Sequence, residues 1–91
     1  MLTEKNHPGP SSIGKVSIYL HANLARFVGG STKPSIVLIK EGETLVEIIS
    51  RFEIPASEIS FMIVNGNMIS DHQIALNPGD EIHFFGIVGG G

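Results

Sequence analysis

The amino-acid sequence predicts an α+β fold in which a mixed sheet packs on one main helix. Two observations lead to this prediction. Several short segments alternate apolar and polar residues with the period of two typical of half-buried strands, and one segment repeats its apolar residues with the period of an amphipathic helix. The chain has 91 residues, of which 42% are hydrophobic and 16% charged, so it forms one globular domain at most.

The composition excludes several classes of function. The chain contains no cysteine, which excludes disulfides, thiolate metal sites, a cysteine nucleophile and a persulfide carried on the chain itself. The net charge of −3 argues against nucleic acid as a partner, because nucleic-acid binders are normally basic. A domain this small has little room for a deep pocket, which predicts a protein that acts together with a partner.

The hydropathy pattern indicates where in the cell the protein is located. No segment approaches the roughly 18 consecutive apolar residues of a membrane helix, so no membrane partner is expected. The first residues lack the apolar stretch of a signal peptide. We therefore expect a cytoplasmic protein.

The chain is expected to divide into an arm, a domain and a tail. Residues 1–14 are rich in proline, glycine and serine, which predicts a disordered N-terminal arm. A single folded domain is expected over residues 15–87. Residues 88–91 are expected to form a flexible C-terminal glycine tail.

The first half of the domain reads as two strands. Apolar and polar residues alternate over residues 15–21, which predicts a strand with one buried face. A connection over residues 23–34 follows and offers Leu24 and Phe27 to the core. Residues 35–40 are a short β-branched apolar run, and we expect them to pair with the first strand as an antiparallel hairpin.

The next segment carries the signature of a helix start. Thr44 and Glu47 have the spacing of a capping box, in which each side chain bonds to a free backbone N–H of the other residue. An apolar stripe with helical spacing follows, made of Leu45, Ile48, Ile49 and Phe52. The helix is expected to end by about Ile54, because the residue before Pro55 disfavours helical dihedral angles.

Three strands complete the domain. Residues 59–64 and 67–69 flank Asn65-Gly66, a strong signal for a type I′ hairpin turn. The last strand is expected over residues 81–88, after a turn at residues 77–80. Two hairpins around one helix give the β-grasp, or ubiquitin-like, topology; the order of the strands within the sheet does not follow from the pattern.

The sequence shows no catalytic constellation. The histidines, His7, His21, His72 and His83, lack the spacing of a metal site, and no metal ligand is predicted. His21 and His83 alternate with apolar residues on expected strands, which places them on solvent faces. No nucleophile elbow and no phosphate-binding glycine loop is present, so no stably bound cofactor is expected.

The chain ends in Val88 and three glycines, Gly89, Gly90 and Gly91. Ordering glycine costs more backbone entropy than ordering any other residue, so stability gives no reason for them. A tail without Cβ atoms can thread a narrow channel, and its terminal carboxylate is open to a nucleophile or a nucleotide phosphate. The alternative at this point is a frayed end or a cloning remnant.

The closing motifs point to a known family. A Gly79-Asp80 turn, a strand with the paired aromatics Phe84-Phe85 and a Gly90-Gly91 terminus follow one another. This ending resembles that of the MoaD/ThiS sulfur-carrier family, and within it most closely the small subunit of molybdopterin synthase. Three earlier stretches agree with it: Val64-Asn65-Gly66, Glu41–Leu45 and Leu20–Gly30. The resemblance departs at Gly86-Ile87, where members often carry Pro-Pro.

The resemblance implies a function for the tail. The Gly91 carboxylate would be adenylated by a ubiquitin-activating-type adenylyltransferase, which supplies ATP and Mg²⁺, and a persulfide sulfur donor would convert it to a thiocarboxylate. Residues Gly89–Gly91 would enter the large subunit of molybdopterin synthase, where sulfur builds the dithiolene of the molybdenum or tungsten cofactor. The chain would then be a co-substrate and subunit rather than a stand-alone catalyst.

The last strand supplies candidates for the partner interface. Phe85 and Ile87 point away from Ile82 and Phe84, and with Val88 they are the expected contacts; the alternative is that they pack under a loop.

Three other functions stay open. The chain could carry sulfur for thiamine-thiazole synthesis, although the Leu20–Gly30 stretch favours molybdopterin. It could be a ubiquitin-like modifier joined to lysines of target proteins. In a different class, it could be a non-catalytic β-grasp binding module with incidental glycines.

Overall fold

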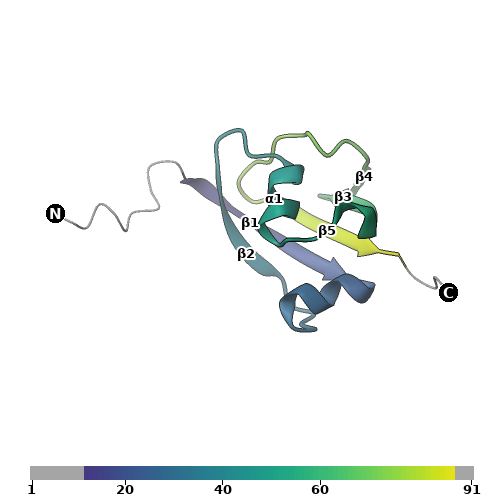
Figure 1. The fold of residues 1–91 in the computed structure, drawn as a ribbon. Helices are drawn as coiled ribbons and strands as arrows, with labels where there is room; N and C mark the ends of the chain where they lie inside the picture. The colour runs from purple at the N-terminus through teal and green to yellow at the C-terminus, as the bar shows by residue number, and fades with distance from the viewer. Residues whose placement is uncertain (1–11, 88–91) are drawn as a thin grey trace.

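The computed structural model describes residues 12–87 and shows a mixed five-stranded sheet with one α-helix packed on one face (Figure 1). The elements follow in the order β1 (Ser12–His21), the 3₁₀ helix η3 (Ala22–Val28), β2 (Ser35–Lys40), α1 (Leu45–Arg51), the 3₁₀ helix η4 (Ala56–Glu58), β3 (Ile59–Val64), β4 (Asn67–Ile69) and β5 (Glu81–Gly86). The predicted α+β, β-grasp architecture is confirmed.

The strands lie in the order β2-β1-β5-β3-β4. β1 and β5 run parallel at the centre, and the other neighbouring pairs are antiparallel. The predicted hairpin of β1 and β2 is confirmed, as is the hairpin of β3 and β4, whose turn residues Asn65 and Gly66 have φ angles of 52° and 86°. β5 ends at Gly86, and Val88 lies outside the described residues.

β1 begins at Ser12, so the prediction of a disordered arm up to residue 14 is wrong for Ser12–Gly14. Ser12 pairs with Lys40 and Gly14 with Ile39, with an irregularity between them. A Cβ atom on Gly14 would lie 2.6 Å from the Cβ of Pro78, so glycine permits this close packing. Gly14, a residue of low β propensity, lies within the strand here because tertiary contacts outweigh composition. The rest of the predicted arm, residues 1–11, lies outside the described residues.

The start of α1 is the predicted capping box. The Glu47 backbone N–H donates to Thr44 Oγ1 at 3.4 Å, and the Thr44 N–H donates to Glu47 Oε1 at 3.0 Å. The helix ends at Arg51, earlier than the expected limit at Ile54, because Glu53 adopts a left-handed backbone with φ of 59°.

A buried carboxylate fixes the turn before α1. Glu43 is only 2% exposed, and its Oε1 accepts hydrogen bonds from the Lys40 backbone N–H at 3.0 Å and from Arg51 Nη2 at 2.8 Å. The Leu76 N–H donates to the Glu43 carbonyl at 2.8 Å. One acidic residue thus joins the end of β2, the last turn of α1 and the segment before β5, a role that the sequence pattern did not reveal.

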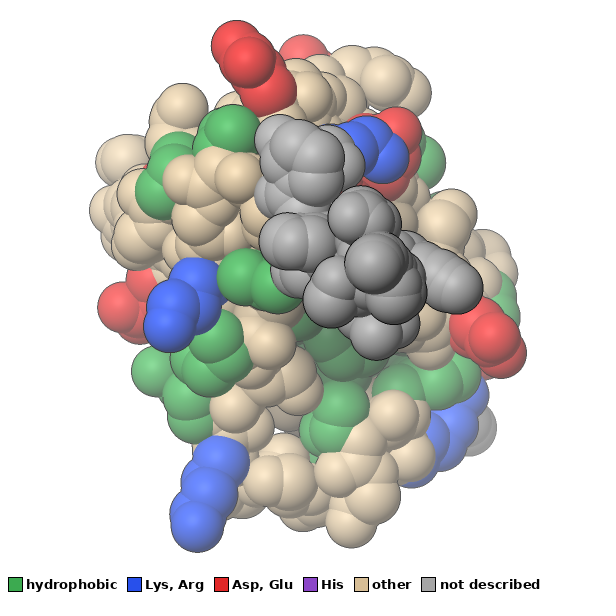
Figure 2. Space-filling view, turned by 90° about the vertical axis from the view of Figure 1, so that its left-hand side faces the viewer, with side chains coloured by type: hydrophobic (Ala, Val, Ile, Leu, Met, Phe, Trp, Pro, Cys, Tyr) green, Lys and Arg blue, Asp and Glu red, His purple; other side chains and the backbone are tan. Residues whose placement is uncertain are grey.

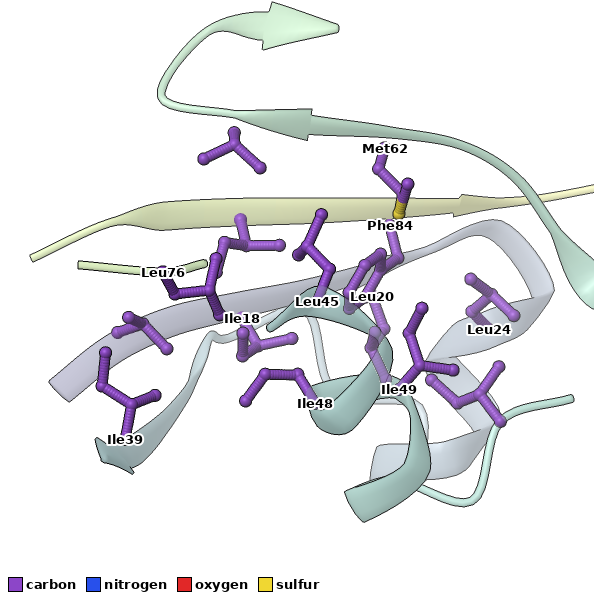
Figure 3. Packing of buried hydrophobic residues seen from close by; sticks show 14 residues of the cluster. Ile18, Leu20, Leu24, Ile39, Leu45, Ile48, Ile49, Met62, Leu76 and Phe84 are labelled. Carbon is purple, nitrogen blue, oxygen red and sulfur yellow. The ribbon is translucent and has the colours of Figure 1, made fainter. Parts of the chain in front are cut away.

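The core fills the space between α1 and the sheet (Figure 3). The fully buried Leu45 and Ile48 of α1 lie over Ile18 of β1 and Phe84 of β5. The predicted packing of the 23–34 connection is confirmed by Leu24, which is completely buried, although the segment forms η3 rather than an irregular loop.

Candidate functional site

β5 is the last element before the glycine tail in the sequence. Its last residue, Gly86, lies against η3: a Cβ atom added there would collide with Asn23 Oδ1 and would lie 3.0 Å from Leu24 Cγ. Because no positive φ is involved, the need for glycine here is steric. η3 thus occupies the space that a side chain at this position would need.

Of the predicted interface residues, the structure describes Phe85 and Ile87. Ile82 and Phe84 are completely buried, so β5 does present Phe85 to the opposite face, as expected. Phe85 is half-buried there and Ile87 is 51% exposed. Val88 and the tail glycines Gly89, Gly90 and Gly91 lie outside the described residues.

The sheet face turned away from α1, here called the open face, is rich in apolar side chains. By their alternation with buried residues, its members are Lys15, Ser17, Tyr19 and His21 on β1, Ile36 and Leu38 on β2, Glu81, His83 and Phe85 on β5, Phe61 and Ile63 on β3, and Met68 on β4. Ile36 is 59% and Met68 69% exposed. The apolar side chains of this face are exposed on β2, β3 and β4 and half-buried on β1 and β5. Such an apolar surface is typical of a site that binds another protein.

Phe85 lies in a stack of aromatic rings at the centre of the open face. Its ring centroid is 4.3 Å from that of His21 and 4.5 Å from that of Phe61, and the rings are nearly parallel. One step along the strands, the rings of Tyr19 and His83 stack at 4.4 Å. Each stack joins neighbouring strands and gives the face a fixed shape.

The two histidines of the open face are in direct contact. His21 Nε2 lies 2.8 Å from His83 Nδ1, and His83 Nε2 lies 2.8 Å from Glu81 Oε2. Burial, and then the neighbouring His83, lower the pKa of His21 below its ordinary value. The predicted face of both residues is correct, but their contact was missed. It follows from the parallel pairing of β1 with β5, which brings together alternating aromatic and histidine positions far apart in the sequence.

The remaining surface offers a hollow and a mixed charge distribution. A hollow of about 330 Å³ opens between β3, β4 and His72, with Phe61 and Met68 in its wall. At the end of the molecule seen in Figure 2, acidic and basic side chains are spread around the rim rather than gathered by sign. Over residues 12–87 no cluster of three or more histidine or acidic side chains is placed to hold a metal ion. Within the same range no helix is long and apolar enough to cross a membrane.

The fold defines a class: a small ubiquitin-like β-grasp protein, in which the central strand β5 is followed in the sequence by glycines. The ThiS family model matches residues 18–91, and the chain belongs to this family, which groups the small MoaD/ThiS-like sulfur carriers and modifiers. The predicted MoaD/ThiS membership is therefore confirmed. Family members interact with activating enzymes.

Solved structures share the fold. The HVO 2177 protein of Haloferax volcanii superposes with a TM-score of 0.70 at 18% identity, covering 93% of this chain and 92% of that one. The small archaeal modifier protein 1 (SAMP1) of Methanosarcina acetivorans gives a TM-score of 0.61 at 21% identity, covering 86% of this chain and 97% of that one. At these identities the likeness shows the fold. No curated protein matches the chain significantly.

Proposed function

We propose that this protein carries sulfur as a thiocarboxylate on Gly91. The observation that supports this most directly is that the ThiS family match extends to the last residue, so the diglycine end belongs to the matched region. The absence of cysteine is compatible with this chemistry, because the carboxylate of the chain itself becomes the sulfur-bearing group.

The chemistry begins with activation, because a carboxylate is a poor acyl donor until one of its oxygens becomes a good leaving group. At a ubiquitin-activating-type enzyme the Gly91 carboxylate attacks the α-phosphorus of Mg²⁺-bound ATP and releases pyrophosphate. A persulfide sulfur then displaces AMP, and a second thiol of the donor system cleaves the acyl disulfide to leave the thiocarboxylate. ATP, Mg²⁺ and the catalytic side chains belong to these partners.

For the destination of the sulfur, we favour the dithiolene of the molybdenum or tungsten cofactor, built in the large subunit of molybdopterin synthase. The motif resemblance over Leu20–Gly30 supports this choice. That stretch forms η3, which packs against Gly86 where the tail leaves the sheet. In this role the chain is a cytoplasmic subunit and co-substrate, with Phe85, Ile87 and Val88 at the interface. The thiamine-thiazole pathway is the alternative destination.

A second candidate is a ubiquitin-like modifier joined to lysines of other proteins. The structural likeness to a protein named as a small archaeal modifier supports it. Both functions begin with adenylation of Gly91 and differ in what attacks the activated carbonyl, a sulfur or an amine.

The test is the intact mass of the protein after incubation with a ubiquitin-activating-type enzyme, ATP, Mg²⁺ and a persulfide donor. We expect a gain equal to the replacement of one oxygen by sulfur, located on the C-terminal peptide. Lysine-linked adducts in a pull-down would instead favour the modifier. If neither product forms, only the β-grasp binding module remains.

A further inference from the structure

The turn between β3 and β4 contains an asparagine followed by glycine, Asn65-Gly66. In such a pair the glycine nitrogen can attack the asparagine side chain, because glycine has no Cβ atom to hinder the approach. We propose that Asn65 is a deamidation site, that its hydrogen bonds to the start of β5 slow the reaction in the folded chain, and that the product weakens the attachment of the turn to β5. The chemistry of this site does not depend on the proposed function of the tail.

The reaction replaces the side-chain amide of Asn65 by a carboxyl group and consumes one molecule of water. The Gly66 nitrogen forms a bond to Cγ of Asn65, and the bond from Cγ to Nδ2 breaks. The Gly66 N–H proton passes through solvent to Nδ2, which leaves as ammonia. Water then opens the cyclic imide at either carbonyl and gives aspartate or isoaspartate. No oxidation or reduction occurs, so the site needs no cofactor.

The side chain of Asn65 is held on β5 and on the turn before it. The Asn65 backbone N–H donates to the Glu81 carbonyl at 2.9 Å, and Asn65 Oδ1 accepts the Glu81 backbone N–H at 2.9 Å. Asn65 Nδ2 donates to Asp80 Oδ1 at 2.8 Å. Both polar atoms on Cγ, including the nitrogen that has to leave, are therefore engaged in the folded chain.

The register of the sheet explains this placement. Val64 pairs with Ile82, so Asn65 stands opposite Glu81 at the next step of the ladder. The hairpin turns the Asn65 backbone to a left-handed φ of 52°, and the side-chain oxygen takes the place of the backbone carbonyl as acceptor for the Glu81 N–H. The same geometry that makes the turn tight thus ties the reactive side chain to β5.

The other reactant is open to solvent. Gly66 has no heavy atom within 4 Å of the position where a Cβ would stand, so water reaches this side of the turn. Asp80, by contrast, is fixed, because its Oδ2 accepts the Asn77 backbone N–H at 2.9 Å. Release of the Asn65 side chain from β5, rather than access of water, therefore limits the reaction in the folded chain.

The product no longer fits the site. A carboxylate has no N–H to donate, so the hydrogen bond to Asp80 is lost. Two carboxylates then face each other where an amide and a carboxylate did, and like charges at this separation repel. Isoaspartate also lengthens the backbone by one carbon within the turn. Deamidation of Asn65 therefore loosens the β3–β4 hairpin from β5.

The experiment follows the intact mass of the purified full chain during storage at a fixed, slightly alkaline pH, and peptide fragmentation locates the modified residue. Asp80→Ala removes the acceptor of Asn65 Nδ2. Asp71→Ala is the matched control, because the Asp71 carboxylate also accepts a nearby backbone N–H, from Gln73, but does not bond to Asn65. Circular dichroism checks that each variant is folded, and the wild type in urea gives the rate without protection.

We expect a mass gain equal to the replacement of one amide by a carboxyl group, found first at Asn65. Asp80→Ala should deamidate several-fold to about tenfold faster than the wild type and Asp71→Ala, the effect of losing one hydrogen bond to a carboxylate. An equal or slower rate in a folded Asp80→Ala, or earlier modification of another asparagine, would overturn the inference. If Asp80→Ala does not fold, equal rates for the wild type in buffer and in urea would overturn it.

A second pair of variants tests the effect of the product. Asn65→Asp introduces the charge that deamidation creates and should lower Tm relative to the wild type. Adding Asp80→Asn should restore part of the loss, because an amide donor again faces a carboxylate across the same gap. An unchanged Tm for Asn65→Asp would contradict the weakened attachment of the turn.

Discussion

Substitution of Gly86 by alanine probes the contact that fixes the tail exit. The added Cβ would collide with the Asn23 amide oxygen and would lie 3.0 Å from Cγ of Leu24, which is completely buried. Overpacking of this kind costs about 1–3 kcal/mol. For a domain of this size each kcal/mol lowers Tm by about 4–8 °C, so we expect a loss of roughly 4–24 °C.

The assay is urea and thermal unfolding of four proteins: wild type, Gly86→Ala, Asn23→Ala and the double variant. Because the nearest atom is Asn23 Oδ1, the truncation should partly rescue Gly86→Ala, with a coupling energy of about 0.5–3 kcal/mol. Gly30→Ala is the matched control, since its φ of 81° strains alanine in open space and Asn23→Ala cannot relieve it. Strictly additive effects of Gly86→Ala and Asn23→Ala would refute the steric explanation.

Three further outcomes are expected. Phe85→Ala removes the central ring of the aromatic stack and should weaken binding to the large subunit of molybdopterin synthase by about 1–3 kcal/mol in a titration. Circular dichroism should show that the variant stays folded, and an unchanged affinity contradicts the interface role. Glu43→Ala leaves the Arg51 guanidinium without its buried partner and should lower the free energy of unfolding, measured in urea, by about 1–3 kcal/mol. An unchanged free energy of unfolding would mean that water replaces the carboxylate. Deletion of Gly90 and Gly91 should abolish sulfur loading in the mass assay with an unchanged Tm, and loading that persists would place the reactive group elsewhere.

Local signals in the sequence predicted local structure well. Thr44 and Glu47 cap α1 as expected, and Asn65-Gly66 forms the expected turn, because each depends on residues close in sequence. The start of β1 was predicted too late, since it depends on the approach of Gly14 to Pro78 from a distant segment.

The site was predicted in part. The orientation of Phe85 follows from strand alternation, because the neighbouring Phe84 is buried. The hydrogen bond between His21 and His83 depends on the parallel pairing of the first and last strands, which no local pattern encodes. The buried role of Glu43 was missed for the same reason, because its partner Arg51 and the Leu76 backbone come from separate elements.

The parallel pairing of β1 and β5 also determines how the domain responds to mechanical force. A partner that draws on the tail pulls β5 along its own axis while β1 and β3 hold it on both sides. In this shear geometry the ladder bonds resist together, whereas strands pulled apart sideways lose them one after another. A pull applied along β5 at Gly86 would therefore load the ladder bonds on both of its sides together.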